Sequence, residues 1–91
     1  MTDAVNTQEL TLIDFYADWC GPCQAMSPLI DRLKSEVDIK VEKINIEKQP
    51  DLAQLFQVRS IPTFVLMRNG EVLKAHIGAM SYARLVEFAK V

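Results

Sequence analysis

The sequence is poor in cysteine, glycine and histidine, with two, three and one of each in 91 residues. Two cysteines only three positions apart cannot supply the framework of bridges that stabilises small secreted domains. A structural zinc ion needs four ligands, and the only Cys and His donors are Cys20, Cys23 and His76. A zinc site built by one chain is therefore disfavoured, and a metal shared by two chains is a lesser alternative.

The chain also lacks an excess of basic charge and long apolar runs. Its net charge is −2 at pH 7, so no basic surface indicates binding to nucleic acid. No apolar run approaches the ~20 residues that a membrane-spanning helix needs. Residues 1–10 have neither the basic start nor the apolar centre of a secretory signal. We therefore expect a cytoplasmic protein, where a close cysteine pair indicates redox or metal chemistry.

The length and the apolar content predict one small domain, residues 1–91, that acts as a monomer. Residues 11–17 are almost all apolar, as in a buried strand, and residues 24–37 repeat apolar side chains at helical spacing. Residues 39–46 predict a second strand. A strand, a helix and a strand in this order form a crossover unit with parallel strands.

The second half of the chain predicts a helix, a hairpin and a last helix. The helix begins near Pro50, and the hairpin joins strands at 63–67 and 71–77 through Asn69-Gly70, a strong type I′ turn signal. Ser81 can cap the last helix. The expected architecture is α/β: a central mixed four-stranded sheet with helices on both faces.

The segment Trp19-Cys20-Gly21-Pro22-Cys23 lies between the first strand and the first helix. A thiolate at a helix N-terminus is stabilised by free backbone N–H groups and the helix dipole. We assign Cys20 as the attacking thiol, near the surface, and Cys23 as the shielded resolving thiol. Gly21 and Pro22 keep the turn tight and both sulfurs within reach of each other.

These residues resemble the thioredoxin family. The five-residue segment is that family's active-site motif, and Phe15, Ala17 and Trp19 match the approach to it. Ile61-Pro62-Thr63 matches the family's cis-proline segment, and Asn69-Gly70 and Gly78 match its hairpin and the loop that follows. The resemblance runs from about Leu10 to Val91, with the motifs in the right order, and it implies a thioredoxin-like fold.

The resemblance also implies roles for two charged residues. Asp14 matches the family's buried aspartate below the resolving cysteine, where it moves a proton to or from Cys23. Lys43 matches the lysine beside that aspartate. From the residues alone, the lesser alternative for Asp14 is an ordinary polar residue with an unseen partner. Lys43 is equally read as a solvated strand lysine, or as a charge that protects a sheet edge.

A substrate-binding rim is implied by the same resemblance. The Ile61–Pro62 bond is expected to be cis, which the residues alone do not predict because a proline at the start of a strand is normally trans. Trp19, Ile61, Pro62, Gly78 and Ala79 would surround Cys20 and pair with the backbone of a substrate strand. The alternative for Trp19 is a packing and shielding role.

The chain departs from the family at its start and near the thiols. Only ten residues precede the first strand, so either the family's usual first strand is lost or a short helix replaces its first strand and helix. Residues 39–46 would then form an exposed edge. Tyr16 and Gln24 stand where the family often has tryptophan and lysine, and the second change removes a positive charge close to the thiols.

The implied activity is that of a protein-disulfide reductase, a thiol–disulfide oxidoreductase that carries electrons in cell redox homeostasis. Its partners would be a thioredoxin reductase and disulfide-containing proteins, with no cofactor bound here and NADPH used only by the reductase. Two alternatives stay open. One is a disulfide oxidant or isomerase, and the other is a thioredoxin-fold binding subunit of a larger assembly.

Overall fold

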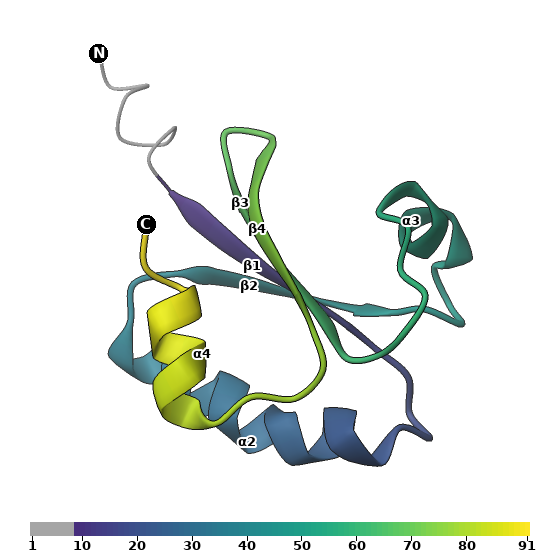
Figure 1. Ribbon diagram of the computed structural model, residues 1–91, viewed down its shortest axis with the longest axis horizontal. Coiled ribbons are helices and arrows are strands. Elements are labelled where there is room, and N and C mark those ends of the chain that lie inside the picture. The colour runs from purple at the N-terminus through teal and green to yellow at the C-terminus, as the bar shows by residue number, and fades with distance from the viewer. Residues whose placement is uncertain (1–8) are drawn as a thin grey trace.

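The structure, a computed structural model, describes residues 9–91. Along the chain the elements are β1 (Leu10–Tyr16), α2 (Gly21–Glu36), β2 (Lys40–Asn45), α3 (Pro50–Leu55), β3 (Thr63–Arg68), β4 (Glu71–Ile77) and α4 (Tyr82–Phe88) (Figure 1). Their order is the one that the sequence predicts. The expected loss or replacement of the family's first strand and helix falls on the chain start, most of which lies outside the described residues.

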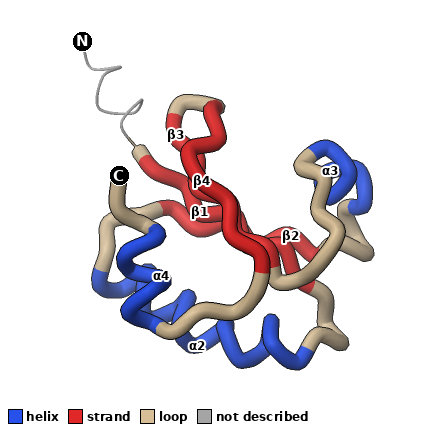
Figure 2. The backbone as a smooth tube through the Cα atoms, viewed as in Figure 1, coloured by secondary structure: helices blue, strands red, loops and turns tan. Residues whose placement is uncertain are grey.

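The four strands form one mixed sheet in the order β2-β1-β3-β4 (Figure 2). β1 pairs with β2 in parallel, and the β1–β3 and β3–β4 pairs are antiparallel. The expected mixed four-stranded sheet is therefore confirmed. Within residues 9–91, β2 lies at an edge of the sheet, as expected. The turn between β3 and β4 has positive φ at Asn69 and Gly70 (58° and 78°), which is the signature of type I′.

The helices cover both faces of the sheet, as predicted (Figure 1). On one face, α2 and α4 pack over the strands, with a core made of Leu12, Met26, Ile30, Leu33, Phe64, Leu85 and Ala89. On the other face, α3 and the segment after it cover a smaller cluster that contains Ile13, Phe15, Ile44 and Val65. Because side chains alternate along a strand, Asp14 points to the same face as Leu12, towards α2.

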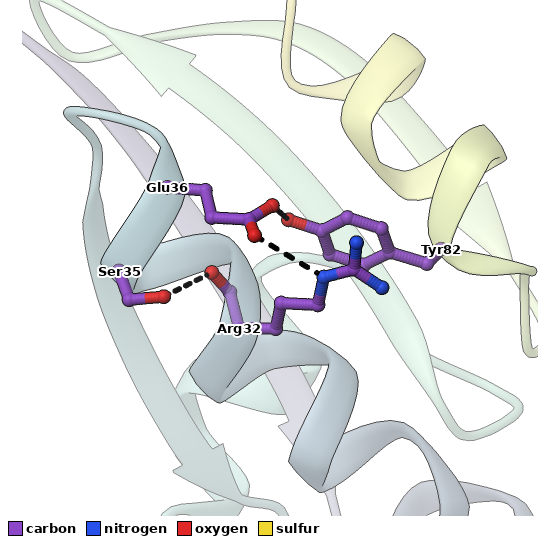
Figure 3. A network of polar contacts seen from close by, with 4 residues as sticks. All are labelled: Arg32, Ser35, Glu36 and Tyr82. Atoms are coloured by element: carbon purple, nitrogen blue, oxygen red, sulfur yellow. Dashed lines mark hydrogen bonds and ion pairs between the residues drawn. The ribbon is translucent and has the colours of Figure 1, made fainter.

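A polar clasp joins the end of α2 to the start of α4 (Figure 3). The Tyr82 hydroxyl donates a hydrogen bond to Glu36 Oε1 at 2.6 Å, and Arg32 Nε donates to Glu36 Oε2 at 3.4 Å. The Arg32 guanidinium lies 4.0 Å from the centre of the Tyr82 ring. The bond from Tyr82 holds the pKa of Glu36 below its ordinary value, and the same bond raises the pKa of Tyr82.

Removing the clasp should weaken the packing of α4 only slightly, because its polar groups lie at the surface, where such bonds contribute little. We expect Tyr82→Phe, which keeps the ring, to lower the midpoint of urea unfolding by a small but measurable amount. Leu85→Ala in the buried core of α4 should cost far more, about 2–5 kcal/mol. If both variants lost the same stability, the hydroxyl would have a larger role than this account gives it.

Candidate functional site

The cysteine pair lies where β1 passes into α2. Cys20 is the N-cap residue of α2, with φ −87° and ψ 108°, and its Sγ accepts a hydrogen bond from the Cys23 backbone N–H at 3.2 Å. Pro22 lies in the first turn, where its missing N–H costs nothing. α2 begins at Gly21, three residues before the run of apolar side chains at helical spacing, because the cysteine itself caps the helix, as expected for a thiol at a helix N-terminus. A thiolate at Cys20 would meet the positive end of the helix dipole.

Cys20 and Cys23 are joined as a disulfide, with their Cα atoms 5.2 Å apart. The expectation that Cys20 lies nearer the surface than Cys23 is wrong for this state, since their exposed fractions are 4% and 6%. Ile46 and Ile61, from the segments after β2 and before β3, pack against the pair. Both cysteines thus belong to a small apolar cluster. Ile61 was expected near Cys20 from the family resemblance, whereas nothing in the local sequence indicates Ile46.

The expected rim residues lie partly around the disulfide. The Ile61–Pro62 peptide bond is cis, which confirms the expectation from the family resemblance. Gly78 N–H donates to the Pro62 carbonyl at 2.8 Å, so the loop after β4 is held beside the proline. Trp19 is 65% exposed, next to the buried cysteine. Ala79 is exposed beyond Gly78.

Asp14 lies under the cysteine pair, in the middle of β1. Its side chain is 3% exposed, and within the described residues its Oδ1 has no hydrogen-bond partner. Burial raises the pKa of Asp14 to about 6, against a smaller opposing effect of the positive charge on Lys43. A pocket of about 290 Å³ is lined by Asp14 and Cys23 together, with Tyr16 and Lys43 also on its wall. The structure therefore brings the carboxyl group and the resolving cysteine to one small cavity.

Lys43 stands directly opposite Asp14 in the register of β1 and β2. Its ammonium does not pair with Asp14: it donates a hydrogen bond to the hydroxyl of Ser27 on α2, with Nζ and Oγ 3.2 Å apart. The side chain is largely exposed at the mouth of the pocket. Lys43 is therefore a neighbour of Asp14, as the resemblance implies, and it is held there by a residue that the sequence did not single out.

Two side chains near the motif were not expected: Glu47, which contacts Trp19, and Asn45, which contacts Glu47. Trp19 Nε1 donates to Glu47 Oε2 at 2.7 Å, which ties the exposed indole to the segment after β2. Asn45 is buried at the end of β2, and its Oδ1 accepts from the Glu47 N–H at 2.9 Å. A sequence signal existed, because the carboxyl ends of two parallel strands meet at the same edge of a sheet, so polar residues there lie near the motif.

Gln24, which stands where the family often has lysine, forms a hydrogen bond with the loop before the cysteines. Its Nε2 donates to the carbonyl of Asp18 at 2.6 Å, across the turn that carries the cysteines. Asp18 Oδ1 in turn accepts from Asn45 Nδ2 at 3.5 Å. The neutral amide thus fixes the entry to the motif without placing a charge beside it.

In the part of the chain that is described, no group of three or more His, Cys, Asp and Glu side chains is arranged to hold a metal ion. Within residues 9–91, no helix combines the length and the apolar character needed to cross a membrane. The site consists of a disulfide at a helix N-terminus, a buried carboxyl group in the adjoining pocket, and an exposed tryptophan beside the cysteines.

Comparison with known proteins places the chain in a family. The thioredoxin family profile matches residues 2–91. The thioredoxin of Buchnera aphidicola is 41% identical over 86 residues, covering 92% of this chain and 80% of that protein. The thioredoxin of Mycobacterium tuberculosis is 37% identical over 87 residues, covering 93% of this chain and 75% of that protein.

Solved structures agree with the sequence relatives. A mutant thioredoxin from Halobacterium salinarum superposes with a TM-score of 0.87 at 36% identity, over 96% of this chain and 77% of that one. The reduced thioredoxin of Schistosoma mansoni gives 0.86 at 30% identity, over 94% and 81% of the two chains. The chain belongs to the thioredoxin family, and it is an oxidoreductase that acts through the redox-active Cys20–Cys23 disulfide.

Proposed function

We propose that the chain reduces protein disulfides with Cys20 as the attacking thiol, Cys23 as the resolving thiol and Asp14 as the group that handles the proton. The observation that carries this proposal is the pocket that Asp14 and Cys23 share directly beneath the cysteine pair. The disulfide seen here is the product side of the cycle, the state reached after a target has been reduced.

The reaction balances as two thiol–disulfide exchanges. The Cys20 thiolate attacks one sulfur of the target, forming a mixed disulfide while the target's other sulfur leaves as a thiolate. Cys23 then loses its proton and attacks Cys20 Sγ, which breaks the mixed disulfide and releases the second target sulfur. The target gains two electrons, and Cys20 and Cys23 lose them.

Asp14 supports the second step. A thiol must lose its proton before it attacks, and a general base works best when its pKa lies near the operating pH. Burial places the pKa of Asp14 at about 6, well above that of an ordinary aspartate. Around neutral pH its carboxylate can therefore accept the Cys23 proton across the shared pocket. Lys43, opposite Asp14 in the sheet, supplies the positive charge that limits how far the pKa rises.

The exposed surface beside the disulfide suits an extended target segment. Trp19 offers an accessible apolar face, and the backbone at Ile61, before the cis proline, would pair with the target strand. Gly78 and Ala79, in the loop held beside the proline, add little side-chain bulk. Recognition through backbone hydrogen bonds makes few demands on sequence, so we propose a broad range of protein disulfides as substrates.

The electrons would come from a thioredoxin reductase that uses NADPH, with no cofactor bound by this chain. A reductant role suits a reducing compartment, so we propose that the protein works in the cytoplasm, as a monomer. The Gly21-Pro22 pair between the cysteines resembles that of family members that reduce disulfides rather than form or rearrange them.

The test is consumption of NADPH by a thioredoxin reductase in the presence of this protein and insulin as the disulfide substrate. We expect NADPH oxidation that depends on all three components and disappears with Cys23→Ser. If a chemical dithiol supports insulin reduction but the reductase does not, the proposed electron source is wrong, while the dithiol chemistry stands.

A further inference from the structure

Ser27 lies one helical turn after Cys23 on α2, so both side chains face the same pocket. A helix serine often bonds back to a carbonyl of its own helix, as Ser35 does with the Arg32 carbonyl at 2.8 Å. The hydroxyl of Ser27 instead accepts a hydrogen bond from Lys43 Nζ on β2 at 3.2 Å. This is a bond between the helix and the sheet edge, across the mouth of the pocket that contains Asp14.

Two residues of opposite charge line the same pocket without forming an ion pair. Asp14 and Lys43 are register partners with opposite charges, yet within residues 9–91 no ion pair of 4.0 Å or less joins them. Asp14 Oδ1 is left without any hydrogen-bond partner. A buried carboxylate without a partner is unfavourable, and a flexible lysine is the residue best suited to relieve it.

We propose that Ser27 is a positioning residue that holds the Lys43 ammonium at the pocket mouth and away from a direct ion pair with Asp14. The inference rests on the proposed role of Asp14 and assigns to Ser27 the control of that role. Among residues 9–91, Lys43 is the one cation on the pocket wall: α2 contributes Cys23, the loop after β1 contributes the acidic Asp18, and β3 places the apolar Phe64 beside Asp14 in the sheet.

The position of Lys43 affects the reaction because it changes how strong a base the Asp14 carboxylate is. A direct ion pair with Lys43 would stabilise the charged carboxylate and lower the pKa of Asp14 towards that of an ordinary aspartate. A weaker base takes the proton of Cys23 more slowly. By holding the lysine off, Ser27 keeps Asp14 able to exchange a proton near neutral pH.

The experiment is a titration of the Asp14 carboxyl carbon by NMR in the oxidised protein. We expect Ser27→Ala, which frees the ammonium, to lower the pKa of Asp14 by about 0.5 unit or more. Ser27→Thr keeps a hydroxyl and should leave the pKa unchanged. In a Lys43→Gln background, Ser27→Ala should have no effect on the Asp14 pKa, because the cation that moves is gone.

An unchanged or raised pKa of Asp14 in Ser27→Ala would overturn the proposal, as would the same shift in the Lys43→Gln background. A purely structural role for Ser27 would change the unfolding midpoint without changing this titration. In single-turnover kinetics, we expect Ser27→Ala to slow release of the mixed disulfide about 2- to 3-fold near pH 7, with rescue by Ser27→Thr.

The titration also separates this inference from the proposed function. If Asp14→Asn released the mixed disulfide at the wild-type rate, Asp14 would not be the proton acceptor. The effect of Ser27 on the position of Lys43 would still be decided by the titration alone.

Discussion

Cys23→Ser is expected to stop the protein at the mixed disulfide. With a reduced protein and a disulfide substrate, the variant should form a covalent adduct through Cys20 in a single step and then turn over no faster than background. The reason is that only Cys23 lies within reach of Cys20 Sγ, since the two are already joined in the oxidised state. The adduct is read by intact mass spectrometry, and its site by peptide mapping.

Cys20→Ser is the matched control, because it removes the sulfur at the N-terminus of α2 and keeps the other one. It should form no adduct under the same conditions. The structure makes this a sharp test, since both cysteine residues are almost equally buried in the disulfide state and their exposure alone does not decide which one attacks. An adduct through Cys23 in the Cys20→Ser variant, and none in Cys23→Ser, would reverse the assignment.

Asp14→Asn is expected to raise the stability of the protein and to slow the release of the mixed disulfide. The folded protein holds the pKa of Asp14 at about 6 instead of 3.8, and one pKa unit corresponds to about 1.4 kcal/mol. Above pH 6 the charged carboxylate therefore costs about 3 kcal/mol, of which a neutral but still polar amide should recover about 1–3 kcal/mol. The measurement is urea unfolding of the oxidised protein at pH 8, beside the rate of mixed-disulfide release.

The raised pKa of Asp14 also predicts how the stability of the protein depends on pH. Because the pKa of Asp14 is higher in the folded state, the folded protein binds more protons than the unfolded chain between pH 3.8 and about 6. The contribution of Asp14 to stability is therefore fully present below pH 3.8 and is lost as the pH rises through about 6. The stability gain from Asp14→Asn should be large at pH 8 and small at pH 4.

Asp18→Asn is the control for this variant, since Asp18 lines the same pocket but is exposed. It should change the unfolding free energy little at either pH. An Asp14→Asn protein with lower stability and an unchanged rate of release would contradict both the cost of burial and the role in proton transfer.

Local patterns in the sequence were enough to predict most of the fold. The helical spacing of apolar residues gave α2, the Asn69-Gly70 turn gave the hairpin, and Ser81 marked the start of α4, where its hydroxyl accepts from the Arg84 N–H. These features depend on neighbours a few residues away, so the sequence displays them directly. The apolar spacing of α2 becomes visible only at residue 24, so the helix N-terminus at Cys20 was inferred from the cysteine motif and not from the spacing.

The site was less predictable where it depends on contacts between distant segments. Ile46 and Ile61 pack against the cluster that contains both cysteines, and Glu47 accepts a hydrogen bond from the Trp19 indole, because the ends of β1 and β2 meet beside the loop before β3. The cis bond before Pro62 was expected from the family resemblance and not from the residues. Nothing in the sequence predicted a role for Ser27, because serine is common on helices. Its role depends on the hydrogen bond from Lys43, which only the structure shows.

The most direct test of the account is reduction of insulin disulfides by the wild-type protein with a chemical dithiol as electron donor, with Cys20→Ser as the control. The account predicts rapid precipitation of the insulin B chain with the wild type and only the background rate of the dithiol with the variant. A folded wild-type protein that gave no acceleration over the dithiol alone would contradict it.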